Sequence, residues 1–159
     1  MELIYKKSWK YILIRYHTYS FYRPKALKDF SDVSKGDIGG HLEGYHNLSQ
    51  KGDCWAYKNT WVFDKASITE NATISGEAKI YNNVIINGNA KVSGKSMICD
   101  SSVITENAVI KDNVLIGGTT KICGNAQISG NAKISGKSKI SGNTKIDENL
   151  ILENKEIDL

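Results

Sequence analysis

Three histidines are the side chains best suited to acid–base chemistry near neutral pH in this chain: His17, His41 and His46. Glu43 and Asp37 lie near the second and third histidines in sequence, so a histidine base assisted by a carboxylate is one hypothesis for a site. The alternative is that these residues serve in turns or in a cap. No histidine follows position 46, so any such site must draw its histidine from the first third of the chain.

The cysteines are the other reactive side chains. Cys54, Cys99 and Cys123 are odd in number, and no two have the C-x-x-C spacing typical of a metal site. We therefore expect unpaired, reduced thiols. The run GDIGG at 36–40 lacks the spacing and the strand–helix setting of a phosphate-binding loop, and is more typical of a turn. The sequence predicts no catalytic residue, no metal and no cofactor.

The elements that would position these residues follow a six-residue repeat, which runs from Asn59 to Asn154 without an insertion. The second place of each block is mostly small, and the fourth place is always a branched aliphatic. Residues two apart share one face of a strand, so both places are expected to point inward. The sixth and first places are rich in Gly and Asn, which tolerate the positive φ of a corner. The fourth-place residues are Val62, Ile68, Ile74, Ile80, Ile86, Val92, Ile98, Ile104, Ile110, Ile116, Ile122, Ile128, Ile134, Ile140, Ile146 and Leu152.

A longer period is marked by asparagines at the first place of every third block. We call this set the asparagine ladder: Asn71, Asn89, Asn107, Asn125 and Asn143. Identical amides that stack above one another can hydrogen-bond along the stacking axis. This 18-residue period therefore predicts three strands in each coil and a triangular cross-section.

Together these patterns predict an all-β fold, a single-stranded left-handed parallel β-helix with three strands per 18-residue coil and about five coils. Residues 51–159 are expected to form the hexapeptide-repeat solenoid. Residues 1–50 are expected to form a β-rich capping segment, whose many aromatic side chains seal the first coil. A second interpretation of this aromatic and basic segment is a surface that binds a ligand or nucleic acid.

One of the three predicted faces differs from the others because its outward residues are apolar. We call this set the apolar stripe: Trp61, Phe63, Tyr81, Met97, Cys99 and Leu115. Exposed apolar patches on soluble proteins usually mark interfaces. We therefore predict a homo-oligomer, with a trimer as the expected assembly, or the docking of another protein. The alternative is that the N-terminal segment folds back over this face.

Four short motifs precede the repeats: ALKDF at 26–30, GDIGG at 36–40, NLS at 47–49 and GDCW at 52–55. With the NA-x-[VI]-x-G repeats, they resemble a group of bacterial and prophage left-handed β-helix proteins of unknown function, often labelled hexapeptide transferases or polymer-forming proteins. The resemblance covers most of the chain from Ala26 and implies an architecture rather than an activity. Hexapeptide-repeat acyltransferases use a histidine in or beside a coil, usually with a projecting loop, and the sixteen repeats here contain neither.

The composition of the chain narrows the remaining classes of function and partner. Residues 1–50 hold eight Lys and Arg against five Asp and Glu, and the rest of the chain holds thirteen against twelve, so the net charge of +4 gives little support to nucleic-acid binding. There is no apolar run long enough for a bilayer and no signal-peptide pattern, so we expect no membrane partner and a cytoplasmic protein.

The function predicted from the sequence is a non-catalytic binding or scaffolding protein that acts through protein–protein contacts. If it is encoded by a phage, it could bind and inhibit a host defence component in the host cytoplasm. The alternative is a hexapeptide-repeat acyltransferase whose site forms between subunits and uses the histidines of the N-terminal segment.

Overall fold

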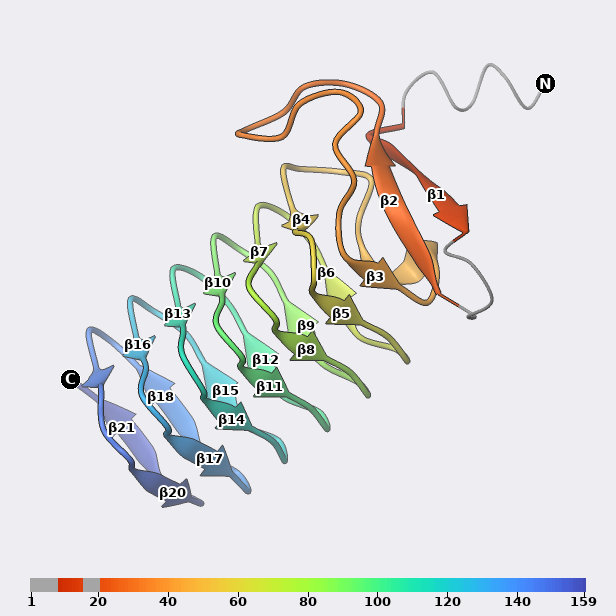
Figure 1. Cartoon of the computed structure of the whole chain (residues 1–159). Helices are drawn as coiled ribbons and strands as arrows, with labels where there is room; N and C mark the ends of the chain where they lie inside the picture. The colour runs from red at the N-terminus through yellow and green to blue at the C-terminus, as the bar shows by residue number, and fades with distance from the viewer. Residues whose placement is uncertain (1–8, 16–20) are drawn as a thin grey trace.

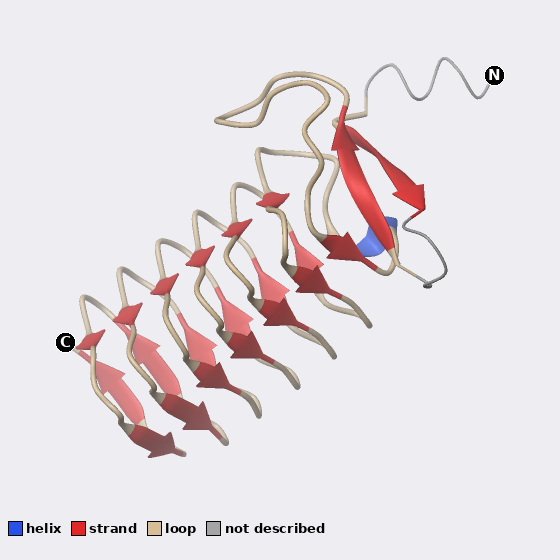
Figure 2. Ribbon diagram, viewed as in Figure 1, coloured by secondary structure: helices blue, strands red, loops and turns tan. Residues whose placement is uncertain are grey.

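The structure is a computed structural model that describes residues 9–15 and 21–159 (Figure 1). His17 lies outside the described residues. Strands dominate the described part of the chain, and its one helical element is the three-residue 3₁₀ helix η1 (Tyr45–Asn47) (Figure 2). Stacked coils form a prism, with a hairpin at its N-terminal end (Figure 1).

Three sheets form the faces of this prism, and most of their strands are two residues long. The first sheet contains β1 (Tyr11–Arg15), β2 (Tyr22–Ala26), β3 (His41–Leu42), β5 (Trp61–Val62), β8 (Lys79–Ile80), β11 (Met97–Ile98), β14 (Leu115–Ile116), β17 (Lys133–Ser135) and β20 (Ile151–Glu153). The second contains β4 (Trp55–Ala56), β7 (Thr73–Ile74), β10 (Lys91–Val92), β13 (Val109–Ile110), β16 (Gln127–Ile128) and β19 (Lys145–Ile146). The third contains β6 (Ser67–Ile68), β9 (Ile85–Ile86), β12 (Val103–Ile104), β15 (Lys121–Ile122), β18 (Lys139–Ser141) and β21 (Glu156–Asp158).

The strands of successive coils pair in parallel with an offset of three blocks, as Met97 does with Leu115. This register confirms the predicted β-solenoid of three strands per coil. There are about seven turns rather than five, because β3 and β4 already belong to a coil and pair in parallel with β5 and β7. The parallel ladder thus begins inside the segment expected to be a cap. The coil from β3 to β5 is longer than the later coils, since two extra residues lie between Leu48 and Ala56.

The interior is filled by the fourth-place aliphatics, which are buried from Val62 at 0% exposure to Leu152 at 8%. Second-place residues are also buried, except Leu150 in the last block, and some of them carry hydroxyls. Ser96, Ser102 and Thr120 each donate to the carbonyl oxygen three residues earlier, at 2.8, 2.9 and 2.7 Å. These bonds satisfy the buried hydroxyls within their own corners, so polar residues can replace alanine there.

The corners depend on the sixth place of each block, where the backbone has a positive φ in every block except that of Glu148. Glycine is common there, but acidic residues share the conformation, as at Glu70 with φ 58° and Glu106 with φ 60°. Their carboxylates reach along the prism and accept the backbone N–H of the next coil: Gly88 donates to Glu70 at 2.8 Å, and Gly124 to Glu106 at 2.7 Å. Acidic residues at this place therefore join successive coils.

The asparagine ladder is present as the 18-residue period predicts. Each Nδ2 donates to the Oδ1 of the next asparagine, over four steps of 3.2, 3.1, 3.1 and 3.0 Å. A second, shorter ladder joins Asn113, Asn131 and Asn149 at another corner, with distances of 3.0 and 2.7 Å. Both ladders run parallel to the backbone hydrogen bonds between coils.

The N-terminal hairpin of β1 and β2 covers the first coil, because β2 pairs antiparallel with β3. Its fully buried Tyr11 packs against Trp55, and Phe30 packs on the same indole with centroids 5.4 Å apart. Lys10 is 1% exposed, and its Nζ donates to the carbonyl oxygens of Gly52 at 3.2 Å and of Cys54 at 2.7 Å. The ammonium group thus holds the widened corner of the first coil, while burial lowers its pKa.

Candidate functional site

The apolar stripe lies on the outer face of the first sheet, and the structure divides it into two parts. Phe21, just before β2, packs edge-on against Trp61 and Phe63, with ring centroids 5.1 and 6.0 Å away. His41 also stacks on Trp61, with centroids 3.9 Å apart. The N-terminal segment therefore partly covers the part of the stripe at β5, where Trp61 and Phe63 stay partly exposed, and leaves the rest uncovered by the described residues.

The open half of the stripe borders a cavity of about 390 Å³ that spans five coils, from β8 to β20. Tyr81, Met97, Cys99 and Leu115 line it, and it continues past Gly117 and Ser135 to Ile151. Two of its residues stand well out of the surface, Leu115 at 38% and Ile151 at 72% exposure. The sequence-based stripe ended at Leu115, because Lys133 interrupts the apolar sequence before Ile151.

Side chains along the open half are ordered by contacts between coils. The Tyr81 ring stacks on Phe63 at a centroid distance of 5.1 Å, which joins the covered and open halves. The Tyr81 hydroxyl also hydrogen-bonds with Cys99, and this bond is the main reason that the pKa of Tyr81 is raised. Burial raises the pKa of the Cys99 thiol, which favours its protonated form. The open half therefore presents a mainly apolar surface, in which Lys133 is the one charged residue of the lining.

The two described histidines, His41 and His46, contact backbone carbonyl oxygens of the first coils. The Nδ1 of His41 lies 3.2 Å from the carbonyl oxygen of Thr60, and the Nε2 of His46 lies 2.6 Å from that of Asp64. Burial, with a smaller effect from Arg23, lowers the pKa of His41, although the Thr60 contact opposes this shift. Neither ring lines the apolar cavity or the polar groove described below.

The two carboxylates proposed as partners of these histidines accept backbone N–H groups. Glu43 accepts from Asp64 at 2.6 Å, and Asp37 accepts from Ser34 at 2.9 Å. All three cysteines are free thiols. Within residues 9–15 and 21–159, no group of three or more His, Cys, Asp or Glu side chains is placed to hold a metal ion.

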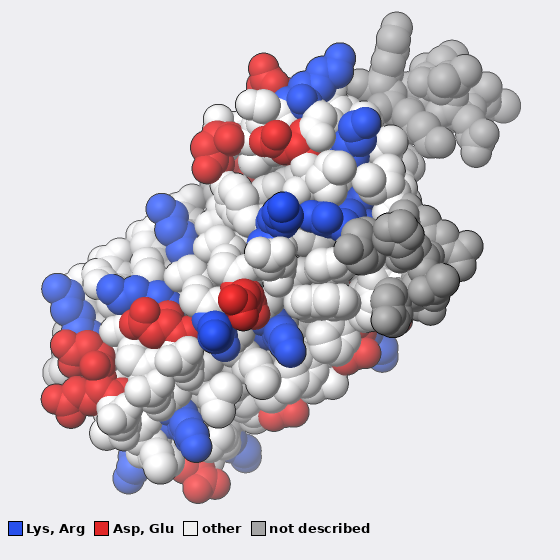
Figure 3. Space-filling view, in the orientation of Figure 1, with Lys and Arg blue, Asp and Glu red and all other residues white. Residues whose placement is uncertain are grey.

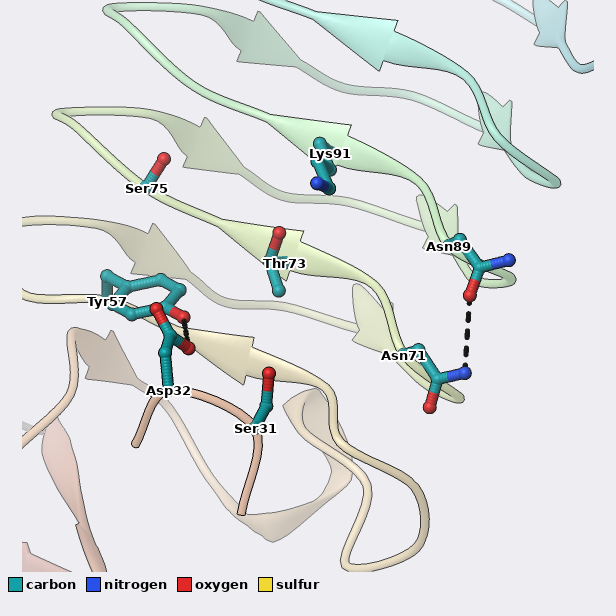
Figure 4. Close-up of a pocket in the computed structure, with 8 residues that line it drawn as sticks. All are labelled: Ser31, Asp32, Tyr57, Asn71, Thr73, Ser75, Asn89 and Lys91. Carbon is teal, nitrogen blue, oxygen red and sulfur yellow. Dashed lines mark hydrogen bonds between the residues drawn. The ribbon is translucent and has the colours of Figure 1, made fainter. Parts of the chain in front are cut away.

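A second hollow, which the sequence did not indicate, lies between the second sheet and the loop that joins β2 to β3. We call it the polar groove; its volume is about 640 Å³ (Figure 4). Its lining is Ser31, Asp32, Tyr57, Asn71, Thr73, Ser75, Asn89 and Lys91. It combines loop residues with outward residues of three successive coils, and only the folded chain brings these together.

Charged side chains of both signs are interspersed on the side of the molecule shown in Figure 3. Nucleic-acid binding by the N-terminal segment stays a prediction, although the described aromatics there are engaged in packing, as in the Trp9–Tyr45 and Tyr11–Trp55 contacts. Among the described residues, no helix has the length and apolar character needed to cross a bilayer.

Comparisons with models of known protein families and with curated proteins found no match. The resemblance to hexapeptide-repeat β-helix proteins, and the bacterial or phage origin that it implies, therefore stay predictions.

Proposed function

We propose that this protein is a non-catalytic binding protein that self-associates through the open half of the apolar stripe. The observation that carries the proposal is the 390 Å³ cavity on the outer face of the first sheet, with Leu115 and Ile151 exposed beside it. A flat, rigid face that is apolar over several coils loses little conformational freedom when it packs against another surface. The transfer of these apolar side chains from water into the interface stabilises the contact.

The shape of this face supports a second copy of the chain as its partner. Along the fifth places, the side chains become smaller from Tyr81 through Cys99 to Gly117 and Ser135. In a two-fold pair with antiparallel solenoid axes that cross near Leu115, Cys99 of each face would meet the small Ser135 of the other, and the two Gly117 residues would face each other. An isologous interface requires such self-complementarity.

Charge supports the same arrangement. Exposed Lys79 lies on β8, towards one end of the open face, and exposed Glu153 lies on β20 at the other end. If the two-fold axis passes near Leu115, Lys79 of each copy approaches Glu153 of the other. Opposite charges at the rim of an interface favour the correct orientation. The expected assembly is then a dimer rather than the trimer predicted from the sequence.

The test is the mass of the protein in solution, measured by light scattering during size-exclusion chromatography. We expect two copies for the unaltered chain and one copy for the double variant Tyr81→Glu, Leu115→Glu. The matched control is Ile85→Glu, Val103→Glu, which places the same charges on two outward residues of the third sheet and should remain dimeric. A monomeric parent, or a double variant that keeps its mass, would refute the proposal.

A charge exchange tests the two-fold geometry separately. Lys79→Glu should weaken the dimer, and adding Glu153→Lys should restore it, because the two charges then attract again across the interface. A trimer that is insensitive to this exchange would retain the stripe as an interface but refute the two-fold arrangement. The non-catalytic assignment has its own test: binding of acetyl-CoA in a calorimeter would contradict it and favour the acyltransferase hypothesis.

A further inference from the structure

We propose that the polar groove binds an oligosaccharide of neutral sugars. The groove lies over the second sheet, whereas the apolar stripe lies on the first, so this proposal is independent of self-association. One wall is the loop between β2 and β3, which extends over β4 in Figure 1. The floor consists of outward residues of β7 and β10 and of two members of the asparagine ladder.

The loop wall is held in place by contacts within the chain. Phe30 and Val33 exchange backbone hydrogen bonds of 3.0 and 2.8 Å, which close a two-residue turn of Ser31 and Asp32. Phe30 packs on the Trp55 indole, and the Tyr57 hydroxyl donates to the Asp32 carboxylate across the base of the groove (Figure 4). The wall is therefore formed before any ligand arrives, which reduces the entropy lost on binding.

The tip of the loop has an unusual backbone conformation. Ser31 has φ 47°, in the left-handed region where a tight turn of this kind normally has glycine. A serine is disfavoured there by its Cβ atom, but it adds a hydroxyl to the groove. In Figure 4 this hydroxyl points from the loop towards Thr73 on β7. Residues in disfavoured conformations cluster at ligand sites.

The floor offers hydrogen-bonding groups at regular intervals, because adjacent coils are about 4.8 Å apart. Thr73 and Ser75 lie on one coil and Lys91 on the next. The bond from Asn71 to Asn89 uses one donor of the first amide and one acceptor of the second. Each amide has two donors and two acceptors, so both kinds of group remain at this corner. A polymer of hydroxylated rings can bond to successive coils in the same way.

The charges and shape of the groove favour sugars over other ligands. Its lining has one cation, Lys91, and one anion, Asp32, whereas a phosphate backbone requires several cations. It has no apolar pocket of the kind that anchors peptide side chains. Sugar hydroxyls donate and accept hydrogen bonds, as serine, threonine and asparagine do. The half-buried Tyr57 adds an aromatic surface on which the C–H side of a sugar ring can pack.

The experiment has two stages. The intact protein is first screened on an array of neutral and anionic glycans, with a single-stranded RNA as a separate probe. The tightest neutral oligosaccharide is then titrated by calorimetry against Thr73→Val and Lys91→Gln. Thr73→Val removes a hydroxyl and Lys91→Gln removes a charged ammonium donor, so we expect affinity to fall about 3- to 10-fold. Lys111→Gln, on the same sheet but outside the groove, is the matched control and should bind as the parent does.

Several outcomes would overturn the proposal. These are binding to no neutral glycan, binding only to anionic glycans or RNA, or equal affinities for the parent and both groove variants. Unfolding midpoints equal to that of the parent would show that the variants are folded, and Ser75→Ala provides a third, smaller change if one of them is not. The dimer mass should be unchanged in all of them, so loss of sugar binding and loss of self-association are separate results.

Discussion

The asparagine ladder gives a sharp test of how the coils are held together, through the variant Asn107→Ala. Asn107 accepts a hydrogen bond from Asn89 at 3.1 Å and donates one to Asn125 at 3.1 Å. An intramolecular hydrogen bond contributes about 0.5–1.5 kcal/mol net. The ladder is solvent-exposed, so the lower part of this range applies to each bond. For the two bonds together, we expect the free energy of unfolding to fall by about 1–2 kcal/mol, measured by urea denaturation followed by circular dichroism.

Two comparisons isolate the ladder from the general effect of replacing a corner asparagine. Asn83 occupies the first place at another corner, and its side chain makes no hydrogen bond to a described residue, so Asn83→Ala should change stability by less than about 0.5 kcal/mol. Asn143, at the end of the ladder, makes one ladder bond and should lose about half as much as Asn107. Equal losses at Asn107 and Asn83 would refute the view that stacked amides join the coils.

A double-mutant cycle of Asn89→Ala and Asn107→Ala completes this test. The two residues share one hydrogen bond, so the double variant should lose less stability than the sum of the single variants, by about 0.5–1 kcal/mol. Additive losses would mean that the shared bond does not contribute. The urea dependence of the free energy should be the same in all variants, because each unfolds a similar surface.

Three further predictions follow from the core, the N-terminal cap and the partly buried ring of His41. Ile98→Ala should lower the free energy of urea unfolding by about 2–5 kcal/mol, since Ile98 is fully buried in the middle of the prism. Lys10→Met should lower it by about 2–3 kcal/mol, because the carbonyl groups of Gly52 and Cys54 lose their donor. The pKa of His41 is lowered in the folded state, so its contribution to stability should rise with pH between that lowered value and 6.5 and be lost on acidification; His41→Phe should remove this part of the pH dependence in thermal unfolding curves.

The regular part of the fold could be predicted because the residue types of each six-residue block indicate which side chains point inward. The fourth-place aliphatics define the inside, and the 18-residue spacing of Asn71, Asn89 and the later ladder residues defines the number of strands per coil. The first coil escaped prediction, because its two extra residues between Leu48 and Ala56 break the six-residue count. The structure shows that its inward residues nevertheless continue the same buried column.

Contacts between parts of the chain that are distant in sequence could not be predicted from the sequence. The sequence indicated that the N-terminal segment and the apolar face could meet, but not that Phe21 would cover Trp61 while leaving Leu115 open. The polar groove depends on the packing of Phe30 against Trp55, which carries Ser31 over the second sheet. The sequence period predicts contacts between residues of the repeats, and the loop between β2 and β3 does not belong to the repeats.

The two periods of the solenoid restrict how the chain can tolerate deletions. Removing one whole coil, such as residues 101–118, would stack Asn89 on Asn125 and shorten the prism by about 4.8 Å, with every face intact. Removing only residues 101–106 would keep an aliphatic at every inward position. It would also turn all later outward residues to the neighbouring face, so that Lys121 stood where Leu115 does. A deletion of six residues therefore preserves the inward pattern of the core, whereas a deletion must remove eighteen residues to preserve the three outer faces as well.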